Sequence, residues 1–158
     1  MRLTDEIEKL FRPLIGQRPW RASVGWGSFV TLDFGPKRKH NHHYHGDWYL
    51  WLYQCEWSLT VHGRCLANSE SKKQVMRLAI DNLKEKELTK LSFDSQRMIT
   101  KFVFKSFLEL ECKPYADATP DEDCWMLFMP NQQVAALRQA GLRYEPMDTA
   151  SEALSVPR

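Results

Sequence analysis

The chain lacks a long apolar run and a marked excess of charge of either sign, and each absence excludes a class of protein. No stretch approaches the ~18 consecutive apolar residues that a transmembrane helix needs. The 22 Lys and Arg residues oppose 20 Asp and Glu residues, which gives a formal net charge of +2. This balance does not give the strong positive field that nucleic-acid-binding proteins usually show, so any basic surface must be local.

The chain also lacks a CxxC pair and an apolar leader. Its four cysteines, Cys55, Cys65, Cys112 and Cys124, occur singly, which argues against a zinc ribbon or a thioredoxin-like centre. The first residues, MRLTDEIEKLFRPLIG, carry charges where a signal peptide has its apolar core. We therefore expect a cytosolic protein with four free thiols, several of them buried as small apolar groups.

Apolar residues recur at helical spacing in two segments. In residues 4–15 they lie three and four positions apart, and acidic residues occupy the first turn, where the helix dipole favours negative charge. The same spacing predicts a second helix from about 71 to 83, with Asn68 or Ser69 as its N-cap.

Apolar and polar residues alternate in the segments that we predict to be strands. The stretch WYLWLY at 48–53 is apolar on both faces, which is typical of a central strand that is covered on both sides. Residues 35–46 hold breakers and charges without apolar alternation, so they predict a loop. The alternating segments are 20–34, 55–61, 90–93, 98–112 and 125–137, three of them with internal turn signals that predict hairpins.

Two helical patterns and about eight strand patterns do not alternate one by one along the chain. This order predicts the α+β class, with a mainly antiparallel sheet, an N-terminal helix and one central helix. We expect a single domain over residues 1–146. Residues 147–158 lack a core pattern and predict a flexible C-terminal tail.

Three motifs follow one another along the chain: GWGSFVTLDFG at 25–35, GDWYLWLYQCEW at 46–57 and WMLFMPNQQVAALRQAG at 125–141. Their order resembles a family of small uncharacterised bacterial proteins whose members run roughly GxGS…FG, GxWxLWxxxCxW and LFxPxxxV…G. The histidine-rich loop and the cysteines beyond Cys55 lie outside that pattern. The resemblance implies a shared fold and carries over no catalytic residue. Some small bacterial proteins of this type sit beside toxins as immunity proteins, which supplies an analogy only.

Four of the five histidines fall within six residues: His40, His42, His43 and His45. Neutral imidazole is a good ligand for zinc, copper and nickel. In an extended segment, however, His40 and His42 would share one face and His43 and His45 the other, so a single strand offers only pairs. A closed site needs further convergent ligands, so we favour a solvated loop over a metal site and predict no cofactor.

The same loop holds the strongest local positive charge of the chain. The candidate binding residues are Lys37, Arg38, Lys39, His42, His43 and Tyr44. Together with the acidic segment at 114–123, the loop could steer recognition of a charged partner. Nucleic acid is less favoured, because the neighbouring aromatic residues lie in a strand pattern typical of burial and match no RNA-recognition motif.

These features favour a non-enzymatic protein that binds another protein, such as an immunity or accessory protein, and assign no catalytic residue. One alternative is a metal-assisted hydrolase that uses the His40–His45 loop. Another is nucleic-acid binding through the basic loop Lys37–His45, for which the affinity would fall steeply with salt. An exposed edge strand could also support a homodimer.

Overall fold

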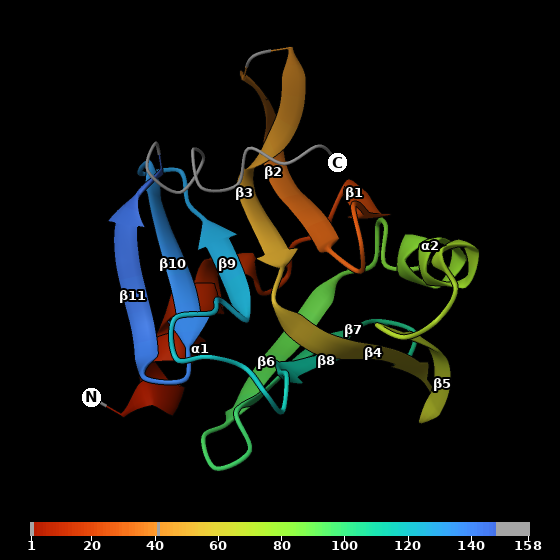
Figure 1. The fold of residues 1–158 in the computed structure, drawn as a ribbon. Coiled ribbons are helices and arrows are strands. Elements are labelled where there is room, and N and C mark those ends of the chain that lie inside the picture. The colour runs from red at the N-terminus through yellow and green to blue at the C-terminus, as the bar shows by residue number, and fades with distance from the viewer. Residues whose placement is uncertain (1, 41, 148–158) are drawn as a thin grey trace.

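The chain forms two antiparallel β-sheets and two α-helices within residues 2–40 and 42–147, which the computed structural model describes (Figure 1). The six-stranded sheet has the order β1 (Arg21–Val24), β2 (Val30–His40), β3 (His43–Leu52), β9 (Trp125–Phe128), β10 (Gln133–Arg138) and β11 (Gly141–Pro146). The five-stranded sheet has the order β5 (Arg64–Asn68), β4 (Cys55–Val61), β8 (Leu108–Pro114), β7 (Ile99–Phe104) and β6 (Leu88–Asp94). The helices are α1 (Leu3–Phe11), which continues into a 3₁₀ turn at Arg12–Leu14, and α2 (Lys73–Asp81). The predicted α+β class with a mainly antiparallel sheet is confirmed.

The two sheets meet where β3 passes into β4 through only Tyr53 and Gln54. The backbone N–H of Tyr53 donates to the carbonyl oxygen of Cys124 at 3.0 Å, and that of Gln54 donates to the carbonyl oxygen of Asp123 at 2.9 Å. The side-chain oxygen of Gln54 accepts from the backbone N–H of Asp123 at 2.8 Å. These bonds hold the segment before β9 against the crossing point, beside the first residue of β4.

The main core joins both sheets to α1. Phe11 of α1 lies edge-on to Phe102 of β7, with ring centroids 5.4 Å apart, and edge-on to Trp125 of β9, with ring centroids 5.1 Å apart. The indole N–H of Trp125 donates to the hydroxyl of Thr100 at 3.0 Å, so the one polar atom of this ring is satisfied inside the core. Contacts between α1 and β6 and between α2 and β1 continue the same packing.

A second cluster of buried side chains lies on the opposite face of the six-stranded sheet. Tyr49 stacks on Phe128 with ring centroids 4.2 Å apart. Leu50 and Leu52, the alternate residues of β3, belong to the main core instead. The prediction of a central strand that is covered on both sides is therefore confirmed for residues 48–52, whereas Tyr53 lies beyond the end of β3. The buried members of the second cluster are Tyr49, Trp51, Met126, Phe128, Val134 and Ala136.

The prediction of a loop over residues 35–46 is wrong. β2 continues to His40 and β3 begins at His43, so most of this segment is a two-stranded ladder. A β-bulge around Gly35 and Pro36 interrupts the register, and Gly35 adopts a φ of +77° there. Beyond the bulge the two strands pair with each other, and most of their described side chains are exposed, so this ladder leaves no apolar alternation in the sequence.

The N-cap prediction for the central helix is also wrong. α2 has Lys72 at its N-cap position and no side-chain cap bond. Asn68 ends β5, and the hydroxyl of Ser69 accepts a hydrogen bond from the backbone N–H of Trp57 at 3.2 Å. For these two residues, hydrogen bonding to the neighbouring strand thus outweighs the preference of Asn and Ser for the N-cap position of a helix.

The count of about eight strands is too low, because β5 and β11 carry weak alternation in the sequence and were not predicted. Of the predicted tail at 147–158, Met147 packs against the second cluster, and residues 148–158 lie outside the described part of the chain. The single-domain assignment stays a prediction. No helix within the described ranges is long and apolar enough to cross a membrane.

Candidate functional site

The basic segment predicted from the sequence forms a projecting arm, which we define as residues 37–46. β1 pairs with β2 only at residues 30–33, and β9 pairs with β3 only at residues 49–52. Residues 37–40 and 43–46 pair only with each other, and Figure 1 shows them extending beyond the body of the six-stranded sheet. The candidate binding residues therefore lie on an extension that a partner can reach from several sides.

A buried carboxylate fixes the base of the arm. Asp33 is 0% exposed, and its two oxygens accept from the backbone N–H of Gly46 at 2.8 Å and from Nε of Arg21 at 2.8 Å. The guanidinium of Arg21 also donates to the carbonyl oxygen of Tyr44. Because a buried charge is tolerated only when paired and hydrogen-bonded, this set of contacts ties β1, β2 and β3 into one unit.

Backbone packing at Gly46 restricts the arm further. A Cβ atom placed on Gly46 would lie 2.3 Å from the carbonyl oxygen and 2.6 Å from the nitrogen of Phe34. On the facing strand, the carbonyl oxygen of Gly35 accepts from the indole N–H of Trp20 at 2.9 Å. Only glycine allows the strands to approach this closely, so the arm leaves the sheet in a defined direction.

One face of the arm carries positive charge that no carboxylate among the described residues neutralises. Lys37, Lys39 and Tyr44 share this face, because Lys39 lies directly opposite Tyr44 in the register. All three are exposed, Tyr44 at 52% of its surface, and Nζ of Lys37 lies 4.8 Å from the ring centroid of Trp20. On the other face, Nε of Arg38 pairs with Asp47 at 3.0 Å.

The histidines of the arm do not gather into one site among the described residues. His42 occupies the turn with a φ of 70°, and the ring of His45 is held between the carbonyl oxygen of Gly46, 2.8 Å from Nδ1, and the ring of Tyr49, 4.6 Å away. The group of metal-ligating residues that does converge in the described part of the chain contains no histidine. The predicted alternative of a histidine metal site stays a prediction.

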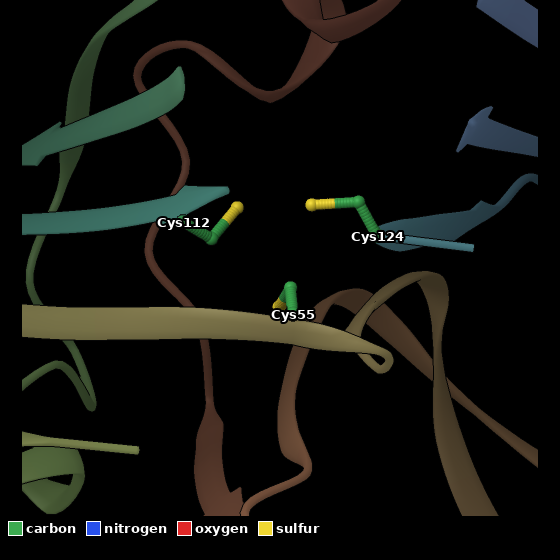
Figure 2. A group of neighbouring side chains, drawn as sticks. All are labelled: Cys55, Cys112 and Cys124. Atoms are coloured by element: carbon green, nitrogen blue, oxygen red, sulfur yellow. The ribbon is translucent and has the colours of Figure 1, made fainter. Parts of the chain in front are cut away.

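The convergent group consists of three cysteines that the sequence spacing does not connect. Cys55 begins β4, Cys112 lies in β8 and Cys124 directly precedes β9. Their Sγ atoms all lie within 4.8 Å of one another, and each residue is 1% exposed. Figure 2 shows the sulfur atoms of Cys112 and Cys124 pointing toward each other, with Cys55 beside the space between them. We refer to these residues as the cysteine trio.

Strand pairing explains why the trio forms. β4 pairs with β8 so that Cys55 is opposite Pro114 and Cys112 is opposite Trp57, which makes the two cysteines diagonal neighbours on the core face. The backbone of Cys124 is fixed on both sides, because its N–H donates to Leu137 at 2.8 Å and its carbonyl accepts from Tyr53. Backbone hydrogen bonds thus fix the position of each of the three cysteines.

The surroundings shift the pKa values of the three thiols in opposite directions. Hydrogen bonds from Cys112 and Cys55 lower the pKa of Cys124 to about 5, against the opposing effect of burial. Hydrogen bonds to Cys124 and Cys55, together with burial, raise the pKa of Cys112 well above its ordinary value. Of the thiols at this position, Cys124 is therefore the one whose thiolate form the neighbouring thiols favour.

The prediction of four free thiols is confirmed, since the structure contains no pair of bonded cysteines among them. Three are buried, whereas Cys65 is exposed on β5. The sequence indicated burial for Cys55 and Cys112, because both fall on the apolar side of an alternating segment. Their convergence with Cys124 could not be read without the register of β4 against β8.

Beside the trio, the carboxylate of Asp123 binds arginine side chains of β10 and β11. Its carboxylate accepts from Nε of Arg138 at 2.9 Å and from the guanidinium of Arg143 at 2.7 Å, and Arg143 also pairs with Glu145. These bonds fix the position of the segment that carries Cys124.

No protein-family model, no curated protein and no solved structure matches the chain.

Proposed function

We propose that the protein is a non-enzymatic binding protein that recognises an acidic surface of another protein through the face of the arm formed by Lys37, Lys39 and Tyr44. The observation that carries the proposal is the combination of an exposed basic face with a base that is fixed by the buried carboxylate of Asp33. A preorganised element loses little conformational freedom on binding, so more of its contact energy appears as affinity.

The chemistry of this face fits a protein partner. Tyrosine supplies a large, rigid contact that can be apolar and hydrogen-bonded at once, and residues of this type often carry the binding energy of protein interfaces. Lys37 and Lys39 flank it and would accelerate the approach of a negatively charged surface. The predicted role as a cytoplasmic bacterial immunity or accessory protein belongs to this proposal.

Nucleic acid is the less favoured partner of the same face. Each phosphate contact requires its own cation, and tight non-specific binding takes several of them. On the arm, Arg38 is paired with Asp47, and at its base Arg21 is paired with Asp33. Lys37 and Lys39 are left to meet a partner's charge, which suits a small acidic patch better than a phosphate backbone.

The test begins with native mass spectrometry of the untagged protein isolated from its own cells, which identifies a bound protein by its mass. The affinity of that purified partner is then measured by calorimetry for the wild type and for a Lys37→Glu, Lys39→Glu variant. The matched control is Lys84→Glu, Lys105→Glu, which changes the net charge equally at exposed lysines outside the arm.

Exposed ion pairs contribute about 0.2–1 kcal/mol each, and reversing two charges replaces attraction by repulsion, so we expect a loss of about 1–2 kcal/mol. This corresponds to roughly tenfold weaker binding. The control variant should bind within twofold of the wild type. Equal affinity of the arm variant and the wild type would refute the proposal. A co-purified nucleic acid whose affinity falls steeply with salt would replace it with the rival partner.

A further inference from the structure

We infer that the cysteine trio is a binding site for a single thiophilic metal ion, Zn²⁺ or Cu⁺. The inference is independent of the proposed function, because the trio lies at the crossing of the two sheets and the arm projects from the six-stranded sheet alone (Figures 1 and 2). It stands on the positions of three sulfur atoms and on their surroundings.

The distances between the sulfur atoms fit a shared ion. A metal–sulfur bond of about 2.3 Å places the sulfur atoms of a three- or four-coordinate site about 3.8–4.0 Å apart. The three Sγ atoms lie within 4.8 Å of one another. Closing the site thus requires only small changes of side-chain torsion angles, while the backbone stays fixed by the β4–β8 ladder and by the bonds on either side of Cys124.

The donor set selects the class of ion. Three sulfur ligands favour soft ions such as Cu⁺ and Zn²⁺ and disfavour Mg²⁺ and Ca²⁺, which prefer oxygen. Within the described residues, no histidine or carboxylate joins the convergent group. Three sulfur atoms complete a trigonal site for Cu⁺, whereas Zn²⁺ usually takes a fourth ligand.

The net charge of the metal complex favours Zn²⁺ over Cu⁺. Three thiolates with Zn²⁺ leave one net negative charge at the site, and with Cu⁺ they leave two, so burial penalises the copper complex more. Coordination number therefore favours Cu⁺ and charge favours Zn²⁺. Both ions share the same chemistry of capture by three thiolates, and the experiment distinguishes them.

The binding step is balanced without any oxidant. Each thiol that is still protonated releases its proton to the buffer as its sulfur forms a bond to the metal, and the oxidation states of the metal and of the sulfur atoms do not change. Burial at 1% exposure keeps the thiols away from large oxidants and exchanging thiols.

The experiment titrates the reduced, untagged full-length protein under anaerobic conditions with Zn²⁺ and, separately, with Cu⁺, each in competition with a coloured chelator. We expect one ion per chain for at least one of the two metals. X-ray absorption of the loaded protein should show a shell of sulfur ligands at about 2.3 Å for zinc. A first shell of nitrogen or oxygen atoms would overturn the inference.

Variants locate the site. Cys112→Ala should weaken metal binding by more than about 100-fold. Substitution of a residue that only hydrogen-bonds to a metal ligand already lowers the affinity by about 10- to 100-fold, and loss of a ligand itself costs more. Cys65→Ala, which removes the exposed thiol, and His42→Ala, His43→Ala, which removes histidines of the arm, should bind as the wild type does.

Loss of binding in the histidine variant, or wild-type affinity in Cys112→Ala, would overturn the inference. If circular dichroism shows that Cys112→Ala does not fold, Cys55→Ala replaces it, and the absorption spectrum of the loaded wild type decides without any variant. Failure of both metals to bind at one ion per chain would overturn the inference and make the trio three packed thiols of the core.

Discussion

Replacing Asp33 by Ala tests whether a buried carboxylate holds the base of the arm. The substitution leaves the backbone N–H of Gly46 without its acceptor in a buried position, which costs about 1–3 kcal/mol. It also removes the partner of Arg21, whose side chain is 36% exposed and can be solvated, so this loss adds at most about 1 kcal/mol. We expect the free energy of unfolding to fall by about 1–4 kcal/mol, which is a large part of the stability of a typical domain at the upper end.

The matched control is Asp47→Ala, which removes the partner of Arg38 on the same arm. Both of these side chains reach solvent, so the loss should stay below about 1 kcal/mol. Urea unfolding followed by tryptophan fluorescence measures both variants against the wild type. Equal destabilisation by the two substitutions would show that Asp33 does not act as a buried anchor, and would remove the argument that the arm is preorganised.

Two further substitutions test the packing on which the sites depend. Gly46→Ala should destabilise the protein by more than Gly63→Ala does, because the new Cβ at Gly46 meets the backbone of Phe34. Gly63 has open space around it, so its substitution adds only the strain of a φ of +77°. Urea unfolding compares the two variants, and a larger effect at Gly63 would contradict the close approach of the strands at Gly46. Phe11→Ala should lower the free energy of unfolding by about 3–5 kcal/mol. Ile15→Ala, at an exposed position, should change it by less than about 1 kcal/mol. If a denaturant titration shows similar losses for the two variants, α1 does not join the two sheets.

The central strand was predictable because its physics is local. In WYLWLY, both alternating sets of side chains are large and apolar, and such a strand is stable only when both faces are covered. The structure places Tyr49 and Trp51 in one cluster and Leu50 and Leu52 in the other. The hairpins of β7 with β8 and of β9 with β10 were predictable for a similar reason, since turn residues separate two alternating segments.

The arm could not be predicted as strand because nothing in its sequence requires burial. Its residues pair through backbone hydrogen bonds. The decisive contacts join Asp33 to Gly46, 13 positions away, and to Arg21, 12 positions away. Alternation within 35–46 carries no trace of these contacts. The candidate binding residues all lie on the arm, but they divide between its two faces: Lys37, Lys39 and Tyr44 share one exposed face, and Arg38 lies on the other.

The cysteine trio was missed for a different reason. Metal motifs are recognised in a sequence by short spacings, and these three residues are separated by 57 and 12 positions. Their meeting depends on the pairing of β4 with β8 and on the short crossing at Tyr53, which brings Cys124 to the start of β4. Long-range register of this kind is a property of the whole fold.

The central claim, that the arm is the binding surface, is tested most directly by photo-crosslinking in living cells. A photoreactive amino acid replaces Tyr44 on the arm in one variant and Phe107, a 68% exposed aromatic residue between β7 and β8, in another. We predict a covalent adduct with one defined protein from position 44 and none from position 107. An adduct from position 107 alone, or from position 44 only to nucleic acid, would contradict the account.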